Sequence, residues 1–255
     1  MIRLTDFPAL VLVLAIVTQG IAVWAGAALL RQRFRLDENA YQDFAVIQAA
    51  TLTLLGLIIG FAFSMAAGRY DQRKNLEEEE ANAIGTEYLR VEVLPAGDAA
   101  KIKAMLSSYL DLRIEHYSTR DPARIATLDA EIAASQRQLW DAVKEPAAAT
   151  PTMVAALALS GMNDVINSQG YAQAAGWNRI PPTAWLLMLA IATCANALVG
   201  IGVRNPRRGS RLLIVFPFVI AIAFALIADI DSPRGGVIRL APQNLIALSQ
   251  SLTPR

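Results

Sequence analysis

Four long apolar segments constrain the fold of this chain more than any other feature of its sequence. They cover residues 7–30, 45–68, 182–203 and 212–230. Each is near or above the roughly 20 residues that an α-helix needs to cross about 30 Å of hydrocarbon. None contains Lys, Arg or Glu, and the only acid is Asp229, at the end of the last segment. A soluble domain of this length would hardly bury four such helices, so the sequence predicts an all-α integral membrane protein.

The apolar segments form two pairs with a long stretch of mixed composition between them. Residues 1–68 hold the first pair and residues 182–230 the second. In residues 69–181, apolar positions recur at the three- and four-residue spacing of amphipathic helices. The predicted architecture is therefore four transmembrane helices in two hairpins, with a helical extramembrane insert between the second and third helices and a C-terminal tail over 231–255.

Within the insert, several residues mark where individual helices begin. Asp121 and Pro122 suit the N-cap and the first position of one helix. A further helix is predicted from Thr152 to about Ala175, separated from the preceding one by residues 146–151. No alternation of apolar and polar residues is long enough to predict a sheet.

Composition excludes several function classes. The formal net charge of +1 gives no electrostatic basis for binding nucleic acid. Cys194 is the only cysteine, so an intrachain disulfide is impossible. The sequence contains no paired nucleophile and base, no phosphate-binding glycine loop and no cluster of metal ligands. We therefore predict no catalytic site, no metal and no cofactor, and the chain is not expected to be an enzyme.

The charges beside the spans do not decide on which side of the membrane the insert lies. The two short loops carry seven arginines, namely Arg31, Arg33, Arg35, Arg204, Arg207, Arg208 and Arg211. The opposite ends of the spans also carry seven cations, namely Arg3, Arg69, Arg73, Lys74, Arg179, Arg234 and Arg239. Positive-inside counting is thus a tie. The first span, with one arginine before it and three just after it, slightly favours an N-terminus outside the cell.

The second span carries a regular line of small residues. Gly56, Gly60, Ser64 and Gly68 recur every fourth residue and so share one side of a helix. We call them the small-residue ridge. Such a ridge lets another helix backbone approach closely, and this close packing drives helix association in lipid. The simpler interpretation is a contact with the first or fourth span of the same chain, and the alternative is an interface between subunits.

An apolar line runs nearly beside the ridge. Leu55, Ile59 and Phe63 also recur every fourth residue. In most membrane proteins such a line faces lipid or a neighbouring helix. If several copies surrounded an axis, the same side chains would form a hydrophobic constriction that gates by dewetting. They are therefore the candidate pore constriction.

Charged residues follow the second span without a helix breaker. Arg69, Arg73 and Lys74 are expected at the water interface, where cations bind lipid phosphate. In a ring of subunits they would instead concentrate anions at a pore mouth. The next acids, Glu77, Glu78, Glu79 and Glu80, point about 100° apart along a helix and cannot converge on one metal ion. We expect them to form a solvated face.

Three runs of residues in this region resemble a known family. They are GFAFSMA at 60–66, RYDQR at 69–73 and EANAIGTEYLR at 80–90. Together with Asn163-Asp164 and the two spans after Pro181-Pro182, they make most of the chain similar to bacterial membrane proteins with a bestrophin-like domain. Bestrophins are pentameric anion channels with four spans per subunit and helical cytosolic segments.

The resemblance implies a homo-oligomer, pentameric as in bestrophins, in the bacterial inner membrane. It would conduct inorganic anions, with the second span lining the pore and Leu55, Ile59 and Phe63 at its neck. It also implies a cytoplasmic insert, opposite to the side that the first span favours. The chain lacks the compact acidic pattern that binds calcium in eukaryotic bestrophins, so calcium activation is not implied.

Two hypotheses follow for the function. The first is a bestrophin-like, homo-oligomeric ion channel. The second is a non-conducting membrane scaffold or envelope-stress sensor that acts through its helical insert. The second is motivated by the large amphipathic insert and by the lack of charged residues deep in the spans, where transporters usually keep functional groups.

Overall fold

The structure of the chain, a computed structural model, describes residues 4–33, 37–203 and 212–252. Within these ranges it consists of helices and connecting segments and has no strand, which confirms the predicted all-α class. Arg3, Arg35 and the four arginines of the second short loop lie outside the described residues. The chain divides into two compact units, which we call the membrane unit (Met1–Tyr70 and Arg179–Arg239) and the insert unit (Asp71–Asn178 and Leu240–Arg255).

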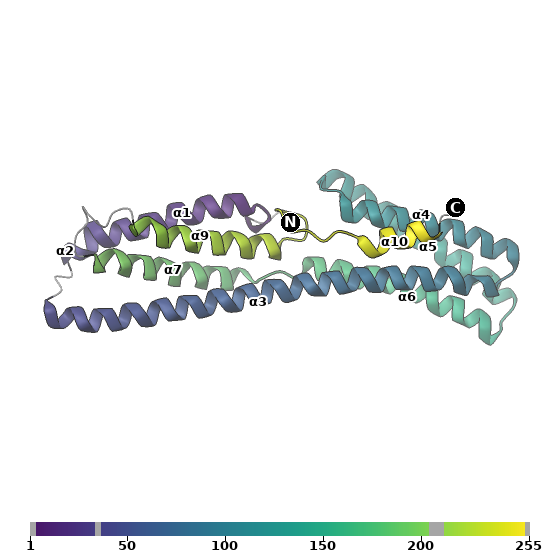
Figure 1. Ribbon diagram of the computed structural model, residues 1–255. Coiled ribbons are helices and arrows are strands. Elements are labelled where there is room, and N and C mark those ends of the chain that lie inside the picture. Colours follow the sequence, from purple (N-terminus) through teal and green to yellow (C-terminus); the bar gives the residue numbers. More distant parts are fainter. Residues whose placement is uncertain (1–3, 34–36, 204–211, 253–255) are drawn as a thin grey trace. The chain divides into compact units, whose positions relative to one another are not determined.

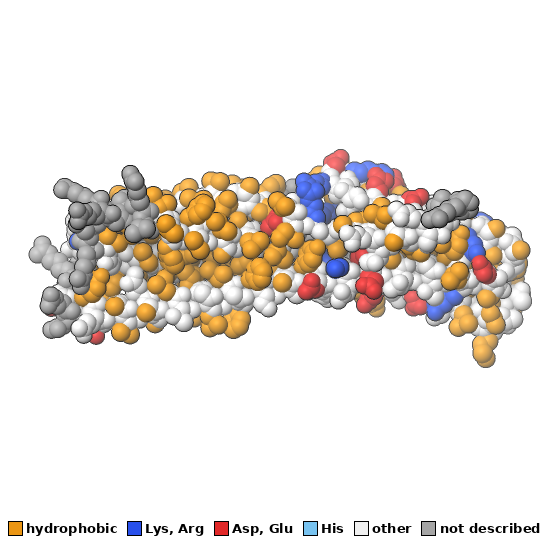
Figure 2. Space-filling view, in the orientation of Figure 1, with side chains coloured by type: hydrophobic (Ala, Val, Ile, Leu, Met, Phe, Trp, Pro, Cys, Tyr) orange, Lys and Arg blue, Asp and Glu red, His pale blue; other side chains and the backbone are white. Residues whose placement is uncertain are grey.

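The membrane unit contains the predicted spans. Its elements are η1 (Leu4–Asp6), α1 (Pro8–Ala25), η2 (Gly26–Leu30), α2 (Arg31–Arg33), the first part of α3 (Glu38–Arg90), α7 (Pro182–Gly202) and α9 (Leu212–Asp231). Among the described residues, four helical stretches are long and apolar enough to cross a membrane, namely Pro8–Arg33, Ala40–Val93, Met153–Gly202 and Leu213–Asp231, and the second and third of these continue into the insert unit. Hydrophobic side chains cover much of the visible face of α1, α7 and α9 (Figure 2), as expected for helices solvated by lipid.

Helices α1 and α7 pack with their backbones in contact. A Cβ atom added to Gly200 would overlap the carbonyl oxygen of Val23 and would lie 2.8 Å from the amide nitrogen of Ala27. Close to this contact, the side-chain amide of Asn196 donates to Oε1 of Gln19 at 2.9 Å, and both residues are buried. Small residues and a buried amide pair are typical of helix association in membranes, where apolar burial alone does not distinguish a protein neighbour from lipid.

Two acids near the end of α9 accept hydrogen bonds from backbone amides of the membrane unit. Asp229, the one acid inside the predicted spans, accepts hydrogen bonds from the amides of Val237 at 2.7 Å and Ile238 at 2.9 Å. The turn between them needs Gly236, whose φ is +73°. Asp231 accepts from the amide of Ile180 at 3.1 Å, just before α7. Both acids therefore have a structural role in the membrane unit.

Helix α3 is a single helix of 53 residues, so it runs uninterrupted beyond the second span as predicted. It has no proline, and it is followed by the short helix η3 (Val91–Val93) before Pro95. Proline disfavours helical geometry in the residue before it. The boundary between the two units falls within α3, after Tyr70.

The insert unit packs the second part of α3 with α4 (Ala96–Ser118), α5 (Pro122–Ala149), α6 (Met153–Trp177) and α10 (Gln243–Leu252) (Figure 1). Asp121 caps α5 by accepting from the amide of Ala123, as the sequence indicated. Thr152, where the next helix was predicted to begin, caps α6 by accepting from the amide of Ala155. The predicted break at 146–151 begins later than expected, because α5 continues through Pro146 to Ala149.

The expectation that the four consecutive acids form a solvated face is wrong for two of them. Glu78 and Glu79 are exposed, but Glu77 and Glu80 are buried. Positions three apart share one side of a helix, and here that side faces the interior of the insert unit.

The predicted C-terminal tail, residues 231–255, is divided between the two units. Its residues up to Arg239 belong to the membrane unit, and the rest belong to the insert unit.

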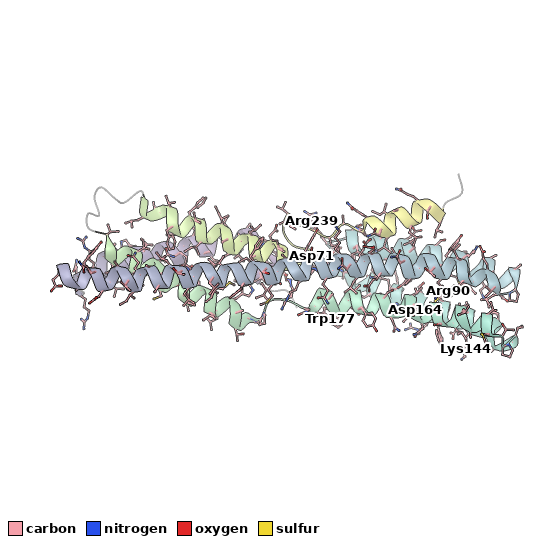
Figure 3. All side chains as sticks on the ribbon, turned by 60° about the horizontal axis from the view of Figure 1, so that its bottom comes forward. Asp71, Arg90, Lys144, Asp164, Trp177 and Arg239 are labelled. Atoms are coloured by element: carbon pink, nitrogen blue, oxygen red, sulfur yellow. The ribbon has the colours of Figure 1, made fainter. Side chains whose placement is uncertain are left out.

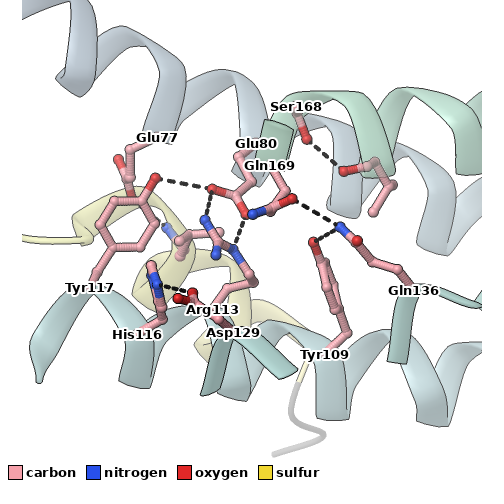
Figure 4. Close-up of polar contacts among 12 residues, drawn as sticks. Glu77, Glu80, Tyr109, Arg113, His116, Tyr117, Asp129, Gln136, Ser168 and Gln169 are labelled. Carbon is pink, nitrogen blue, oxygen red and sulfur yellow. Dashed lines mark hydrogen bonds and ion pairs between the residues drawn. The ribbon is translucent and has the colours of Figure 1, made fainter. Parts of the chain in front are cut away.

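Each of these buried acids has specific partners in the insert unit. Glu77 accepts from the amides of Asn244 and Leu245, both at 3.0 Å, and so caps α10. Glu80 pairs with the Arg113 guanidinium, whose Nη2 lies 3.0 Å from Oε2, and it accepts from the Tyr117 hydroxyl at 3.0 Å (Figure 4). These contacts attach α4 and α10 to α3.

Candidate functional site

Helix α3 carries the least covered of the four apolar stretches. In its most apolar 18-residue window only 6% of the residues are buried, against 33% to 44% in the other three candidate spans. A large apolar and small-residue surface of α3 is therefore available for contact with lipid or with another chain.

One side of α3 is nevertheless covered within the membrane unit. Leu55, Ala62 and Ala66 are buried in its hydrophobic core. Ile58 and Ile59 pack against the same core and are partly buried. At about 100° per residue, these positions share one side of the helix, which we call the covered side of α3.

The small-residue ridge lies away from the covered side. A Cβ atom added to Gly56, Gly60 or Gly68 would have no atom of another element within 4 Å. Ser64 is also exposed. The interpretation that the ridge packs against the first or fourth span of the same chain is therefore wrong, and the ridge is free to contact another molecule.

The predicted apolar line divides between the two sides. Leu55 is only 2% exposed because it belongs to the core of its own unit, so we do not place it at a pore. Ile59 is partly buried, and Phe63 is 41% exposed. Sequence reasoning missed Leu57 and Phe61, which are 52% and 63% exposed. No local signal separates them from Leu55, because all are apolar residues in an apolar segment.

The three predicted cations do not share one environment. Arg69, in the membrane unit, is partly buried, with Nη1 4.0 Å from Oδ1 of Asp231. Arg73, in the insert unit, is buried, and only Lys74 is exposed. The exposed positions of α3 that follow the apolar segment also include Asp71. Lys74 is therefore the one member of the predicted cation cluster that is freely accessible in the subunit.

The structure also bears on metal binding. Among the described residues, no group of three His, Cys, Asp or Glu side chains could hold a metal ion. The single histidine, His116, places Nε2 3.0 Å from Oδ1 of Asp129.

Comparison with known proteins identifies the family. The model of the bestrophin-like domain matches residues 13–245. The chain belongs to the bestrophin-like family. No curated protein matches it. This family assignment agrees with the resemblance inferred from residues 60–90, and the four apolar helices agree with an integral membrane protein.

Solved structures show that this bestrophin-like chain has the same fold as bacterial bestrophin homologues. A bestrophin homologue from Klebsiella pneumoniae solved by zinc phasing has a TM-score of 0.64 and 14% identity, covering 95% of this chain and 96% of that one. A leucine-to-threonine variant of the Klebsiella pneumoniae homologue gives 0.66 and 13%, covering 96% and 97%. A tyrosine-to-alanine variant gives 0.66 and 13%, covering 95% and 96%. The likeness extends over nearly the whole chain.

Proposed function

We propose that this chain is the subunit of a homo-oligomeric ion channel in the bacterial inner membrane, with the uncovered side of α3 lining the pore. The observation that carries the proposal is the bare surface of α3, which combines exposed apolar side chains with the small-residue ridge. A pore-lining helix packs on one side against its own subunit and leaves the opposite side to the axis and to neighbouring copies. Membership of the bestrophin-like family supports the same arrangement.

The helix geometry selects the residues that would face the axis. Leu57, Gly60 and Ser64 lie opposite the covered side at about 100° per residue. Phe61 and Phe63 lie on either flank of this line, and both are exposed. We propose that Leu57 and Phe61 form the apolar neck, that Phe63, almost opposite Phe61 on the helix, lies between neighbouring helices with Ile59 behind it, and that glycines of the ridge let these helices approach.

Widening the neck should increase conduction. We expect Phe61→Ala to raise the single-channel current several-fold, because a wider and less apolar constriction stays hydrated. Purified protein in planar bilayers provides the measurement. Phe218→Ala is the matched control, since Phe218 is an exposed phenylalanine on α9 and should leave the current unchanged. Absence of current from the unaltered protein at all voltages and pH values would contradict the proposal.

Subunit stoichiometry tests the same proposal independently. Native mass spectrometry of the full chain in detergent should give a closed homo-oligomer, with five copies as the resemblance implies. A monomer under conditions that preserve lipid contacts would refute a pore formed between subunits.

We further propose that the conducted ions are inorganic anions, as the resemblance implies. Lys74 is the exposed cation of α3 that would favour them, whereas the nearby exposed Asp71 would favour cations. We expect Lys74→Gln to lower the chloride-to-potassium permeability ratio and Asp71→Asn to raise it. Reversal potentials in a salt gradient measure both changes. A ratio below one in the unaltered protein would reverse the sign of the proposed selectivity.

One observation favours the non-conducting scaffold as a second candidate. Met153 is 88% exposed at the start of α6, and Val154 and Leu157 are exposed beside it. Apolar side chains gathered on an extramembrane surface often mark a site of protein contact. A stable complex with an unrelated protein that Met153→Ser disrupts, together with the absence of current, would support the scaffold over the channel.

A further inference from the structure

Glu87 is an anomalous acid in the core of the insert unit. It lies on α3, its side chain is 0% exposed, and among the described residues neither carboxyl oxygen has a hydrogen-bond partner. The other buried acids of this helix differ, because Glu77 and Glu80 each accept several hydrogen bonds. A buried polar group without a partner is unfavourable, and a buried charge without one is far more so. The position therefore favours a neutral carboxyl group.

The carboxyl group of Glu87 faces α6 at Gly161. A Cβ atom at Gly161 would overlap Oε2 of Glu87 and would lie 2.7 Å from Nη1 of Arg90. Two helices can approach this closely around a carboxyl group only if the facing residue has no side chain. The contact between α3 and α6 is thus built around Glu87.

Two charged groups act on this site. Arg90, one turn further along α3, donates from Nη1 to Oδ2 of Asp164 on α6 at 3.4 Å (Figure 3). Both side chains are partly solvent-exposed, so this ion pair is weak. Arg90 is near enough to Glu87 to change partner if the glutamate becomes charged.

We propose that Glu87 is a proton-controlled contact between α3 and α6. With a neutral Glu87, Gly161 stays seated against α3 and Arg90 stays with Asp164. Ionisation of Glu87 draws Arg90 away from Asp164 and loosens the middle of α6. The ligand of this site is the proton, and the responding element is the part of α6 around Gly161.

The electrostatics place this change near physiological pH. Burial raises the pKa of Glu87 from 4.5 to about 8, Arg90 opposes this increase, and Asp164 adds to it. The folded unit therefore binds the proton more tightly than the unfolded chain does. The contribution of Glu87 protonation to the free energy of unfolding is complete below about pH 4.5 and is lost progressively as the pH rises toward about 8.

Hydrogen exchange on the full chain in nanodiscs tests the responding element. After correction for intrinsic exchange rates, the opening of α6 around Gly161 should increase about 90-fold between pH 6 and pH 9, as the rise of the pKa from 4.5 to about 8 requires. In Glu87→Gln, which mimics the neutral acid, opening should be independent of pH. Glu79→Gln is the control, because Glu79 is an exposed acid on the same helix, and it should behave like the unaltered protein. An equal pH dependence in Glu87→Gln would overturn the proposal.

Infrared spectroscopy tests the proton itself. The unaltered protein should show the carbonyl band of a protonated carboxyl group at pH 6, lost with a midpoint near pH 8 and missing in Glu87→Gln. Gly161→Ala retains Glu87 but displaces its carboxyl group, so the midpoint should move to lower pH. A carboxylate that is already ionised at pH 6, or a midpoint that Gly161→Ala leaves unchanged, would refute the contact. Neither measurement depends on conduction, so this inference can fail while the channel proposal stands.

Discussion

Replacing Gly200 by leucine is expected to prevent the membrane unit from folding. A Cβ atom at this position would overlap the carbonyl oxygen of Val23 and would lie 3.0 Å from Cα of Gly26. These neighbours are backbone atoms of α1 and η2, so they cannot turn aside as a flexible side chain can. Overpacking by one or two methylenes already costs about 1–3 kcal/mol, and leucine would separate α1 from α7 and the buried amide pair of Gln19 and Asn196.

The measurement is the yield of monodisperse full-length protein after extraction in detergent, which we expect to be lost in Gly200→Leu and reduced in Gly200→Ala. Gly20→Leu is the matched control, because Gly20 lies on α1 with open space around it. Gly56→Leu should also fold as a subunit, since its site is equally open, although it should weaken assembly through the small-residue ridge. Normal yield of Gly200→Leu would mean that α1 and α7 are not packed as described.

The elements of this fold could be predicted from the sequence because their signals are local. An apolar run long enough to span a membrane can be recognised from its residue types alone. The unbroken course of α3 follows from the absence of proline until Pro95. Asp121 and Thr152 mark helix starts through hydrogen bonds to amides two or three residues away. In each case the residues that decide the structure lie within the helix itself or directly beside it.

The side of α3 that packs could not be predicted in the same way. A soluble helix shows its buried face by the contrast between apolar and polar residues, but a helix in lipid is apolar all round. Leu55 and Leu57 are therefore equivalent in the sequence, although one is buried and the other is exposed. The pore constriction predicted from periodicity alone therefore included Leu55, although this side chain packs in the core of its own unit.

The buried acids were missed for a different reason, which is the distance to their partners along the chain. Glu80 pairs with Arg113 from α4, and Glu77 caps a helix whose first residue is Gln243. Four consecutive glutamates suggest a solvated face until these partners are known. Glu87 shows the opposite case, because it is buried without a hydrogen-bond partner in the described part of the chain, and its only sequence signal is its place in the run EANAIGTEYLR.

Removing the guanidinium of Arg113 should destabilise the insert unit strongly. Arg113 is 1% exposed and Glu80 is 0% exposed, so Arg113→Met would leave a buried carboxylate whose remaining partner among the described residues is the Tyr117 hydroxyl. Breaking one side of a buried ion pair typically costs about 3–5 kcal/mol. Burial alone would lower the pKa of the Arg113 guanidinium, but the Glu80 carboxylate reverses this and raises the pKa, so arginine stays charged at any pH used for the measurement.

A double replacement separates the ion pair from the packing around it. Glu80→Leu combined with Arg113→Met should recover most of the lost stability, since an apolar pair of similar volume removes the buried charge altogether. Hydrogen exchange of the buried amides of α4 in the full chain measures the free energy of opening in each variant. Arg124→Met is the control, because Arg124 makes a two-bond pair with Glu115 at 2.7 and 2.8 Å on the surface, where water screens the interaction. Equal effects of Arg113→Met and Arg124→Met would show that burial does not govern the strength of the Glu80 contact, and the attachment of α4 to α3 would then have to come from the apolar core alone.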